Sequence, residues 1–132
     1  MKIDKEIFQN TLKAFIDNNE PELRMVDLVD YLNLNWENSD DLKILYFYLG
    51  ILDDSKLIQC LSKDNNLGFS FTSGNVISPN ISTRYRLTNS GHQTYEALSN
   101  DGIWDRIKPK IMELGIETIK QIPSLAIQIV TS

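Results

Sequence analysis

The stretch from Arg84 to Leu98 constrains the fold most, because it runs from a short strand straight into a capped helix. Two arginines alternate with two apolar residues at its start, which is the period of a half-buried strand: Arg84, Tyr85, Arg86 and Leu87. Thr88 follows at once, and its hydroxyl can cap the N-terminus of the next helix. Gly91 has no Cβ, so the first turn of that helix can approach the strands closely. The sequence therefore predicts a structural hinge at Thr88 and Gly91, with Trp104 of the following helix as its third residue.

Apolar residues at helical spacing predict three helices before this hinge. The first covers residues 4–18, and the turn-rich stretch that ends in Pro21 stops it. We expect the second over residues 22–33, although residues 23–33 can also be interpreted as containing a strand. The third covers residues 40–53.

The third predicted helix is apolar nearly all round, whereas a helix on a protein surface normally keeps a polar face. Two explanations fit this composition. The helix is either enclosed by the rest of the chain, or it presents an aromatic face to a partner. In the second case the candidate partner-binding residues are Tyr46, Phe47, Tyr48 and Ile51.

A long hairpin is predicted between the third helix and the hinge. Residues 56–61 read as a short strand, and residues 84–87 as the strand that pairs back and closes the hairpin. Residues 62–83 between them are rich in Ser, Asn, Gly and Thr and contain a further strand near residues 67–72. Arg84 and Arg86 share one strand face, either as an ordinary solvated surface or, together with Lys63, as a phosphate contact.

Two more apolar segments follow the hinge helix. Trp104 anchors a helix that begins near Asp101, and Pro109 within it predicts a kink or a division into two pieces. Residues 116–130 carry an apolar helical face that packs on the same chain or on another subunit. We expect a single domain over residues 1–132, with a core at 1–98 and a C-terminal helical extension at 99–132.

Composition limits the possible partners. The net charge is −5, and the excess of acidic residues lies in the first half of the chain, which disfavours nucleic acid. The single cysteine, Cys60, cannot form an internal disulfide, so a reducing cytoplasm suits the chain. The charged N-terminal residues resemble neither a signal peptide nor a lipid anchor, and no apolar run reaches membrane-spanning length. We therefore expect a cytoplasmic protein that does not bind membranes.

Residues with catalytic or metal-binding chemistry are scarce. The sequence has no Gly-rich phosphate loop, no paired-histidine motif and no nucleophile elbow, and its one histidine is His92. Adjacent carboxylates flank the third helix, where helix-dipole and turn effects explain them. We expect no enzyme activity, no cofactor, no metal site and no small-molecule substrate.

One resemblance to a known family supports this architecture. The segment Leu87-Thr-Asn-Ser-Gly-His-Gln-Thr-Tyr-Glu-Ala-Leu-Ser-Asn-Asp-Gly-Ile-Trp-Asp-Arg-Ile-Lys108 resembles the Leu-Thr-x-x-Gly-His-x-Phe-Leu-Asp…Trp…Lys pattern of the bacterial and phage family called domain of unknown function 2513. The family's Tyr-His-Leu-x-x-Leu-x-x-Ala-Gly-Leu-Ile run corresponds loosely to residues 47–58, where Tyr48 replaces its histidine and Lys56 its glycine. The resemblance implies a winged-helix-like fold and no established activity.

These observations together predict an α+β, mainly helical, winged-helix-like domain. It has three N-terminal helices, an antiparallel hairpin wing of two or three strands, and C-terminal helices. The third helix offers only Lys43 to a DNA groove, whereas its aromatic residues suit a protein surface. The first hypothesis is therefore a protein-interaction or adaptor module that binds a protein partner or self-associates. The alternative is a DNA-binding transcriptional regulator that uses the wing arginines.

Overall fold

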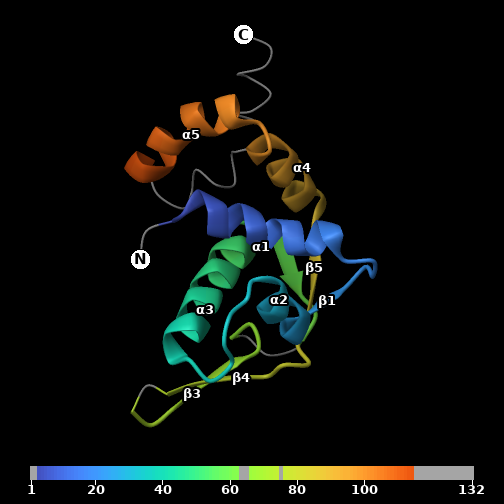
Figure 1. The fold of residues 1–132 in the computed structure, drawn as a ribbon, viewed down its shortest axis with the longest axis vertical. Helices are drawn as coiled ribbons and strands as arrows, with labels where there is room; N and C mark the ends of the chain where they lie inside the picture. The colour runs from blue at the N-terminus through green and yellow to red at the C-terminus, as the bar shows by residue number, and fades with distance from the viewer. Residues whose placement is uncertain (1–2, 63–65, 75, 115–132) are drawn as a thin grey trace.

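The computed structural model describes residues 3–62, 66–74 and 76–114 (Figure 1). Over these residues the chain has five helices, α1 (Lys5–Asp17), α2 (Met25–Tyr31), α3 (Ser39–Asp54), α4 (Asn89–Leu98) and α5 (Asp101–Leu114). Its strands are β1 (Leu23–Arg24), β2 (Ile58–Cys60), β3 (Phe69–Thr72), β4 (Val76–Pro79) and β5 (Arg84–Leu87). The predicted α+β class is confirmed.

The strands form two antiparallel sheets. The first has the order β1-β5-β2, so that β5 lies in the middle, with Leu23 opposite Tyr85 and Ile58 opposite Leu87. The second is the two-stranded hairpin of β3 and β4, in which Phe71 lies opposite Ile77. The predicted closing strand at residues 84–87 is present as β5, and it pairs with β2, the short strand predicted after the third helix.

Residues 62–83 differ from the prediction. The strand near residues 67–72 is β3, and it pairs with β4, a second strand within these residues that the sequence pattern did not predict. The turn residues Ser78 and Pro79 concealed β4, because proline is disfavoured within sheets except on edge strands. In a two-stranded sheet β4 is such an edge.

The second predicted helix also needs correction. Leu23 and Arg24 form β1, and the helix begins only at Met25, while residues 26–31 are helical and not a strand. Leu23 is buried and pairs with Tyr85, so a contact distant in sequence decides its conformation over local helix propensity.

The hydrophobic core lies between the helices and the inner face of the three-stranded sheet. Leu12 of α1, Leu49 of α3 and Tyr85 of β5 are all completely buried within it. Figure 1 shows α1 crossing the molecule, with α4 and α5 on one side and α2 and α3 on the other. The Tyr85 hydroxyl donates a hydrogen bond to the Leu67 carbonyl and so ties β5 to the start of the β3–β4 hairpin.

The C-terminal part of the described chain packs on the N-terminal helix. Trp104 of α5 is buried, and the Lys5 ammonium of α1 lies 5.6 Å from the centre of its ring, within range of a cation–π interaction. The helix continues through Pro109 as one element, so the predicted division into two pieces is absent. The predicted helical face at 116–130 lies outside the described residues.

The hinge has the predicted geometry. Thr88 caps α4, because its hydroxyl accepts a hydrogen bond from the Gly91 amide at 3.1 Å. The Thr88 amide also donates to the Leu57 carbonyl at 2.9 Å, which joins the hinge to the segment between α3 and β2. A Cβ at Gly91 would collide with that same carbonyl and with the Leu87 side chain. The structural roles of Thr88 and Gly91 are thus confirmed.

We predict that Gly91→Ala destabilises the protein by about 1–3 kcal/mol, because the added methyl group meets backbone that cannot move aside. The matched control is Gly50→Ala in α3, where the new Cβ would have no neighbour within 4 Å apart from the adjoining residues and the nearby backbone of its own helix. That substitution should stabilise by about 0.5–1 kcal/mol, since alanine favours helix over glycine. Urea unfolding of the two variants tests both signs, and equal midpoints would contradict the close-packing account.

Candidate functional site

Two of the four predicted partner-binding residues on α3 are not available to a partner. Tyr48 is 3% exposed and Ile51 2%, so both belong to the core. The Tyr48 hydroxyl accepts a hydrogen bond from the Asp4 amide at 2.8 Å, and its burial raises the pKa of Tyr48. The prediction that these two residues form a partner surface is therefore wrong. Their side chains fill the space between α3 and the rest of the domain.

The other two residues, Tyr46 and Phe47, are half-buried against the core. The Tyr46 ring meets Phe69 and Phe71 of β3 edge to face, with ring centroids 5.2 and 5.3 Å apart. Edge-to-face packing of this kind is favourable because the ring edge is positive and the ring face negative. The β3–β4 hairpin is thus the cover that explains the apolar composition of α3.

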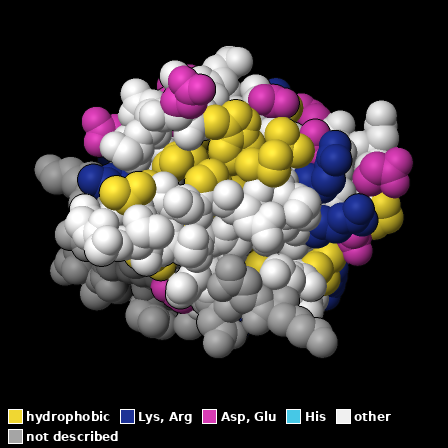
Figure 2. All heavy atoms as spheres, turned by 90° about the horizontal axis from the view of Figure 1, so that it is seen from below, with side chains coloured by type: hydrophobic (Ala, Val, Ile, Leu, Met, Phe, Trp, Pro, Cys, Tyr) yellow, Lys and Arg dark blue, Asp and Glu magenta, His cyan; other side chains and the backbone are white. Residues whose placement is uncertain are grey.

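This hairpin exposes apolar side chains of its own. Five large hydrophobic residues are exposed among the described residues, and three of them lie between positions 71 and 81: Phe71 at 50%, Val76 at 55% and Ile81 at 51%. Phe71 is on the hairpin face that meets Tyr46, Val76 lies opposite Thr72 on the other face, and Ile81 follows the end of β4. We call these three residues together the hairpin surface. Figure 2 views the molecule from the end that carries β3 and β4 in Figure 1, and hydrophobic side chains gather there into a patch.

The hairpin surface could have been found from the sequence by its charge. No charged residue occurs from Asn65 to Thr83, a run of nineteen residues in a chain that is 23% charged. Exposed segments of proteins normally carry charged side chains, so this absence sets the segment apart from the rest of the sequence. The sequence pattern pointed to α3 instead, because α3 has a much higher proportion of hydrophobic residues.

A second surface gathers three of the four arginines of the chain. On the outer side of the three-stranded sheet, Arg24 of β1 lies opposite Arg84 of β5, and Gln59 of β2 lies opposite Arg86. All three arginines are exposed. We call them the arginine face. The predicted shared face of Arg84 and Arg86 agrees with this register, whereas Arg24 was missed because its residue was assigned to a helix.

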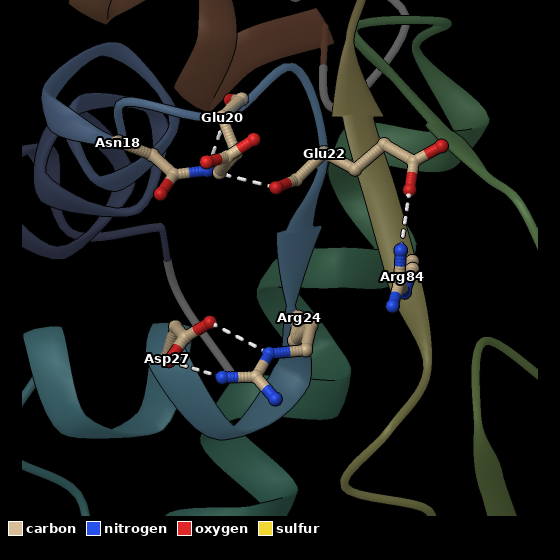
Figure 3. Close-up of polar contacts among 6 residues, drawn as sticks. All are labelled: Asn18, Glu20, Glu22, Arg24, Asp27 and Arg84. Atoms are coloured by element: carbon tan, nitrogen blue, oxygen red, sulfur yellow. Dashed lines mark hydrogen bonds and ion pairs between the residues drawn. The ribbon is translucent and has the colours of Figure 1, made fainter.

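The charges of the arginine face are largely compensated within the chain (Figure 3). Arg84 forms an ion pair with Glu22 at 3.1 Å, and Arg24 forms one with Asp27 at 3.1 Å. Both pairs are exposed, so each contributes only a fraction of a kcal/mol, but each places a carboxylate beside a guanidinium. A phosphate approaching these arginines would also meet the carboxylates.

Arg86 differs from the other two arginines. Its Nε donates a hydrogen bond to the Gln59 side-chain oxygen at 2.7 Å, and this neutral partner leaves the positive charge in place. The third predicted phosphate-binding residue, Lys63, lies outside the described residues. The structure therefore brings together two of the three predicted cations, and one of those two is paired with an acid.

A groove of about 440 Å³ adjoins the arginine face. Its lining mixes both signs of charge and consists of Asn18, Glu20, Pro21, Glu22, Arg24, Asp27 and Arg84. The Asn18 amide donates to the backbone carbonyls of Glu20 and Glu22 at 3.0 and 2.8 Å, which fixes the loop that carries the acids (Figure 3). The groove is thus built from compensating charges rather than from cations alone.

A larger cleft of about 530 Å³ lies among α1, the end of α2 and α3. Its lining has no histidine, cysteine, lysine or arginine, and comprises Glu6, Ile7, Asn10, Thr11, Tyr31, Leu32, Asn33, Leu34, Ile44, Leu45 and Tyr48. Acid–base and nucleophilic catalysis depend on a base placed beside a nucleophile or a substrate proton. This lining offers one carboxylate and two tyrosines, which suits a structural cleft better than an active site.

Within residues 3–62, 66–74 and 76–114, no three His, Cys, Asp or Glu side chains are grouped so as to hold a metal ion. No helix in that same part of the chain has the length and hydrophobicity needed to span a bilayer. His92 is exposed in the first turn of α4. Comparison with known protein families, characterised proteins and solved structures found no match.

Tyr31 at the rim of the larger cleft gives a prediction about pH. Its hydroxyl donates to the Asp17 carboxylate at 2.7 Å, and partial desolvation at the cleft rim followed by this hydrogen bond raises the pKa of Tyr31 to about 12, although the side chain is 39% exposed. Asp17→Asn should lower the pKa of Tyr31 toward its usual value near 10, because the negative acceptor is lost. NMR titration of the tyrosine rings measures this pKa, and Tyr31→Phe identifies the resonance. An unchanged value in Asp17→Asn would exclude the carboxylate as a cause.

The same pair affects stability at high pH. Between pH 10 and 12 the folded state keeps the Tyr31 proton that the unfolded state has lost, so stability falls as pH rises through this range. Asp17→Asn should show a smaller fall over that range.

Proposed function

We propose that this chain is a non-catalytic protein-interaction module with a winged-helix-like architecture, and that the hairpin surface is its binding surface. The observation that carries the proposal is the concentration of exposed apolar side chains on an uncharged hairpin. Apolar and aromatic residues at the centre of an interface contribute most of the binding energy, and charged residues are depleted there.

The winged-helix part of the proposal rests on the order of elements. Three helices precede β2 and β5, the β3–β4 hairpin lies between these two strands, and the capped helix α4 follows β5 directly. The family resemblance has one further support. Lys56, which replaces the glycine of the pattern, has a φ of 61°, a left-handed conformation that favours glycine. Membership of that family stays a prediction.

The packing of the hairpin supports binding at its outer residues rather than at α3 itself. Tyr46 of α3 is covered by Phe69 of β3, which is itself completely buried. Phe71 lies against the same tyrosine yet remains half exposed, at the border between the core and the solvent. A partner that covers Phe71 would therefore bind to a side chain whose position is already fixed, which lowers the entropic cost of binding.

We predict that a photo-crosslinking residue at position 71, 76 or 81 forms protein adducts in the cells that naturally make the protein. The matched controls are positions 13 and 96, which are exposed on α1 and α4. These should give no adduct, because neither lies on the hairpin. Mass spectrometry of the adducts provides the readout, and equal labelling from all five positions would contradict a specific surface.

The alternative function is DNA binding through the arginine face. The gathering of Arg24, Arg84 and Arg86 on one exposed sheet face favours it. The carboxylates of Glu22 and Asp27 and the net charge of −5 oppose it, because they repel a polyanion. In addition, α3 could offer only one exposed cation, Lys43, to a DNA groove, which also opposes this function.

Fluorescence anisotropy with a random DNA duplex at low and moderate salt distinguishes the two functions. We expect no salt-sensitive binding. Affinity that falls steeply with salt, decreases in Arg86→Ala and increases in Glu22→Gln would support the alternative, because the last change frees Arg84 from its acid. Lys13→Ala on α1 is the control for a change of charge elsewhere on the surface.

A further inference from the structure

The partner of the hairpin surface can be inferred from the pairing of β3, an inference that rests on the proposed function. In the two-stranded sheet, each strand pairs on one side only within the described residues. The other edge of such a strand presents backbone N–H and C=O groups that can pair with a further strand. The hairpin therefore has two edges at which a sheet could be extended.

Of these two edges, that of β3 is the better suited to pairing. Pro79 in β4 has no N–H, and the backbone of β4 lies close to α3. By contrast, β3 has the sequence Phe-Ser-Phe-Thr, without proline. Figure 1 shows the hairpin lying across one end of α3 and projecting beyond it, so a neighbouring molecule could reach this edge.

The side chains of β3 lack the charges that usually protect a natural edge strand. One outward donor is already used, because the Phe69 N–H donates to the Asn66 carbonyl at 3.0 Å, so a further strand would meet the Phe71 N–H and the carbonyls of Phe69 and Phe71. Soluble proteins prevent pairing at exposed edges with charged side chains, bulges or proline. In β3 the outward side chains Ser70 and Thr72 are exposed and uncharged, and no charge occurs between Asn65 and Thr83. An edge without charged side chains, next to exposed apolar residues, is what we expect of a strand that pairs with another strand in the working protein.

Charge and symmetry together favour a second copy of this chain as the partner. Residues 1–63 carry seven basic and twelve acidic side chains, a net charge of −5, so two copies repel one another where these residues form the surface. The uncharged hairpin is where two copies can meet with the least repulsion. Two identical antiparallel strands also pair about a twofold axis, the commonest symmetry of homodimers.

We propose that β3 pairs antiparallel with β3 of a second copy, with Ser70 on the twofold axis, so that the two hairpins form one four-stranded sheet. In this register Phe69 and Phe71 each lie opposite the other phenylalanine of the partner strand. Both are on the sheet face that carries Tyr46, so the aromatic packing continues across the interface. Aromatic pairs across neighbouring strands stabilise a sheet.

The register predicts a charge-complementation experiment at Ser70. Sedimentation equilibrium of the wild-type chain over a concentration series should show a monomer–dimer equilibrium. Ser70→Lys and Ser70→Glu should each weaken the dimer by about tenfold or more, because like charges then lie directly opposite at the axis. An equimolar mixture of the two variants should restore the dimer, since opposite charges now face each other.

Controls separate this effect from misfolding and from general charge effects. Gln93→Lys and Gln93→Glu place the same charges on the exposed side of α4 and should leave dimerisation unchanged. Circular dichroism of the Ser70 variants should match the wild type, because Ser70 is exposed on the hairpin face turned away from α3.

The outcomes separate the failure of this inference from the failure of the proposed function. A wild-type chain that stays monomeric at every concentration overturns the inference, as does a mixture of the two variants that fails to dimerise. Protein adducts from positions 71 and 76 would in that case still support the interaction module, with a different partner. If no such adducts form and the chain is also monomeric, both the β3–β3 dimer and the proposed interaction function are wrong.

Discussion

The close contact between the start of α4 and the carbonyl of Leu57 is the constraint on which the rest of the domain depends. The Thr88 amide donates to this carbonyl, and the Thr88 hydroxyl lies within hydrogen-bonding distance of the carbonyls of Lys56 and Leu57. Gly91 lies so near that no Cβ fits there. The contact joins the end of α3, the sheet and α4 at one place, and so fixes where α4 and α5 pack on α1.

A consequence of this arrangement is that α3 becomes a core helix. Its C-terminal end leads into the sheet through Lys56 and Leu57, so its apolar residues face α1 and the sheet. The β3–β4 hairpin then covers Tyr46 on the remaining side. Exposed apolar side chains are therefore found on this cover, at Phe71 and Val76, instead of on the helix. The apolar character of α3 and the exposure of the hairpin thus have one cause.

The arginine face shows how the same residues can suggest different functions before and after their neighbours are known. Arg84 and Arg86 alternate along one strand, which alone is compatible with a phosphate contact. The fold adds Arg24 from β1, and with it the acids Glu22 and Asp27, which lie at the ends of the same short segment. Pairs of exposed opposite charges add little stability, but they reduce the positive potential that a nucleic acid would need.

The local parts of this fold could be predicted from the sequence, because they depend on residues close together in the chain. The cap at Thr88, the need for glycine at position 91, and the helical character of α1, α3 and α4 follow from periodicity, capping and sterics. The strands β2 and β5 were also predictable, since each is a short run of strand-forming residues beside a turn-rich segment.

Other features were decided only by tertiary contacts between distant residues. Leu23 lies in a strand because it pairs with Tyr85. Tyr46 of α3 is covered because β3, more than twenty residues later in the chain, packs against it. The sequence by itself determined that an apolar helix and an uncharged, strand-forming segment exist. Which of the two is buried depended on the tertiary structure, because burial is a property of the contacts that the whole chain makes and not of local composition.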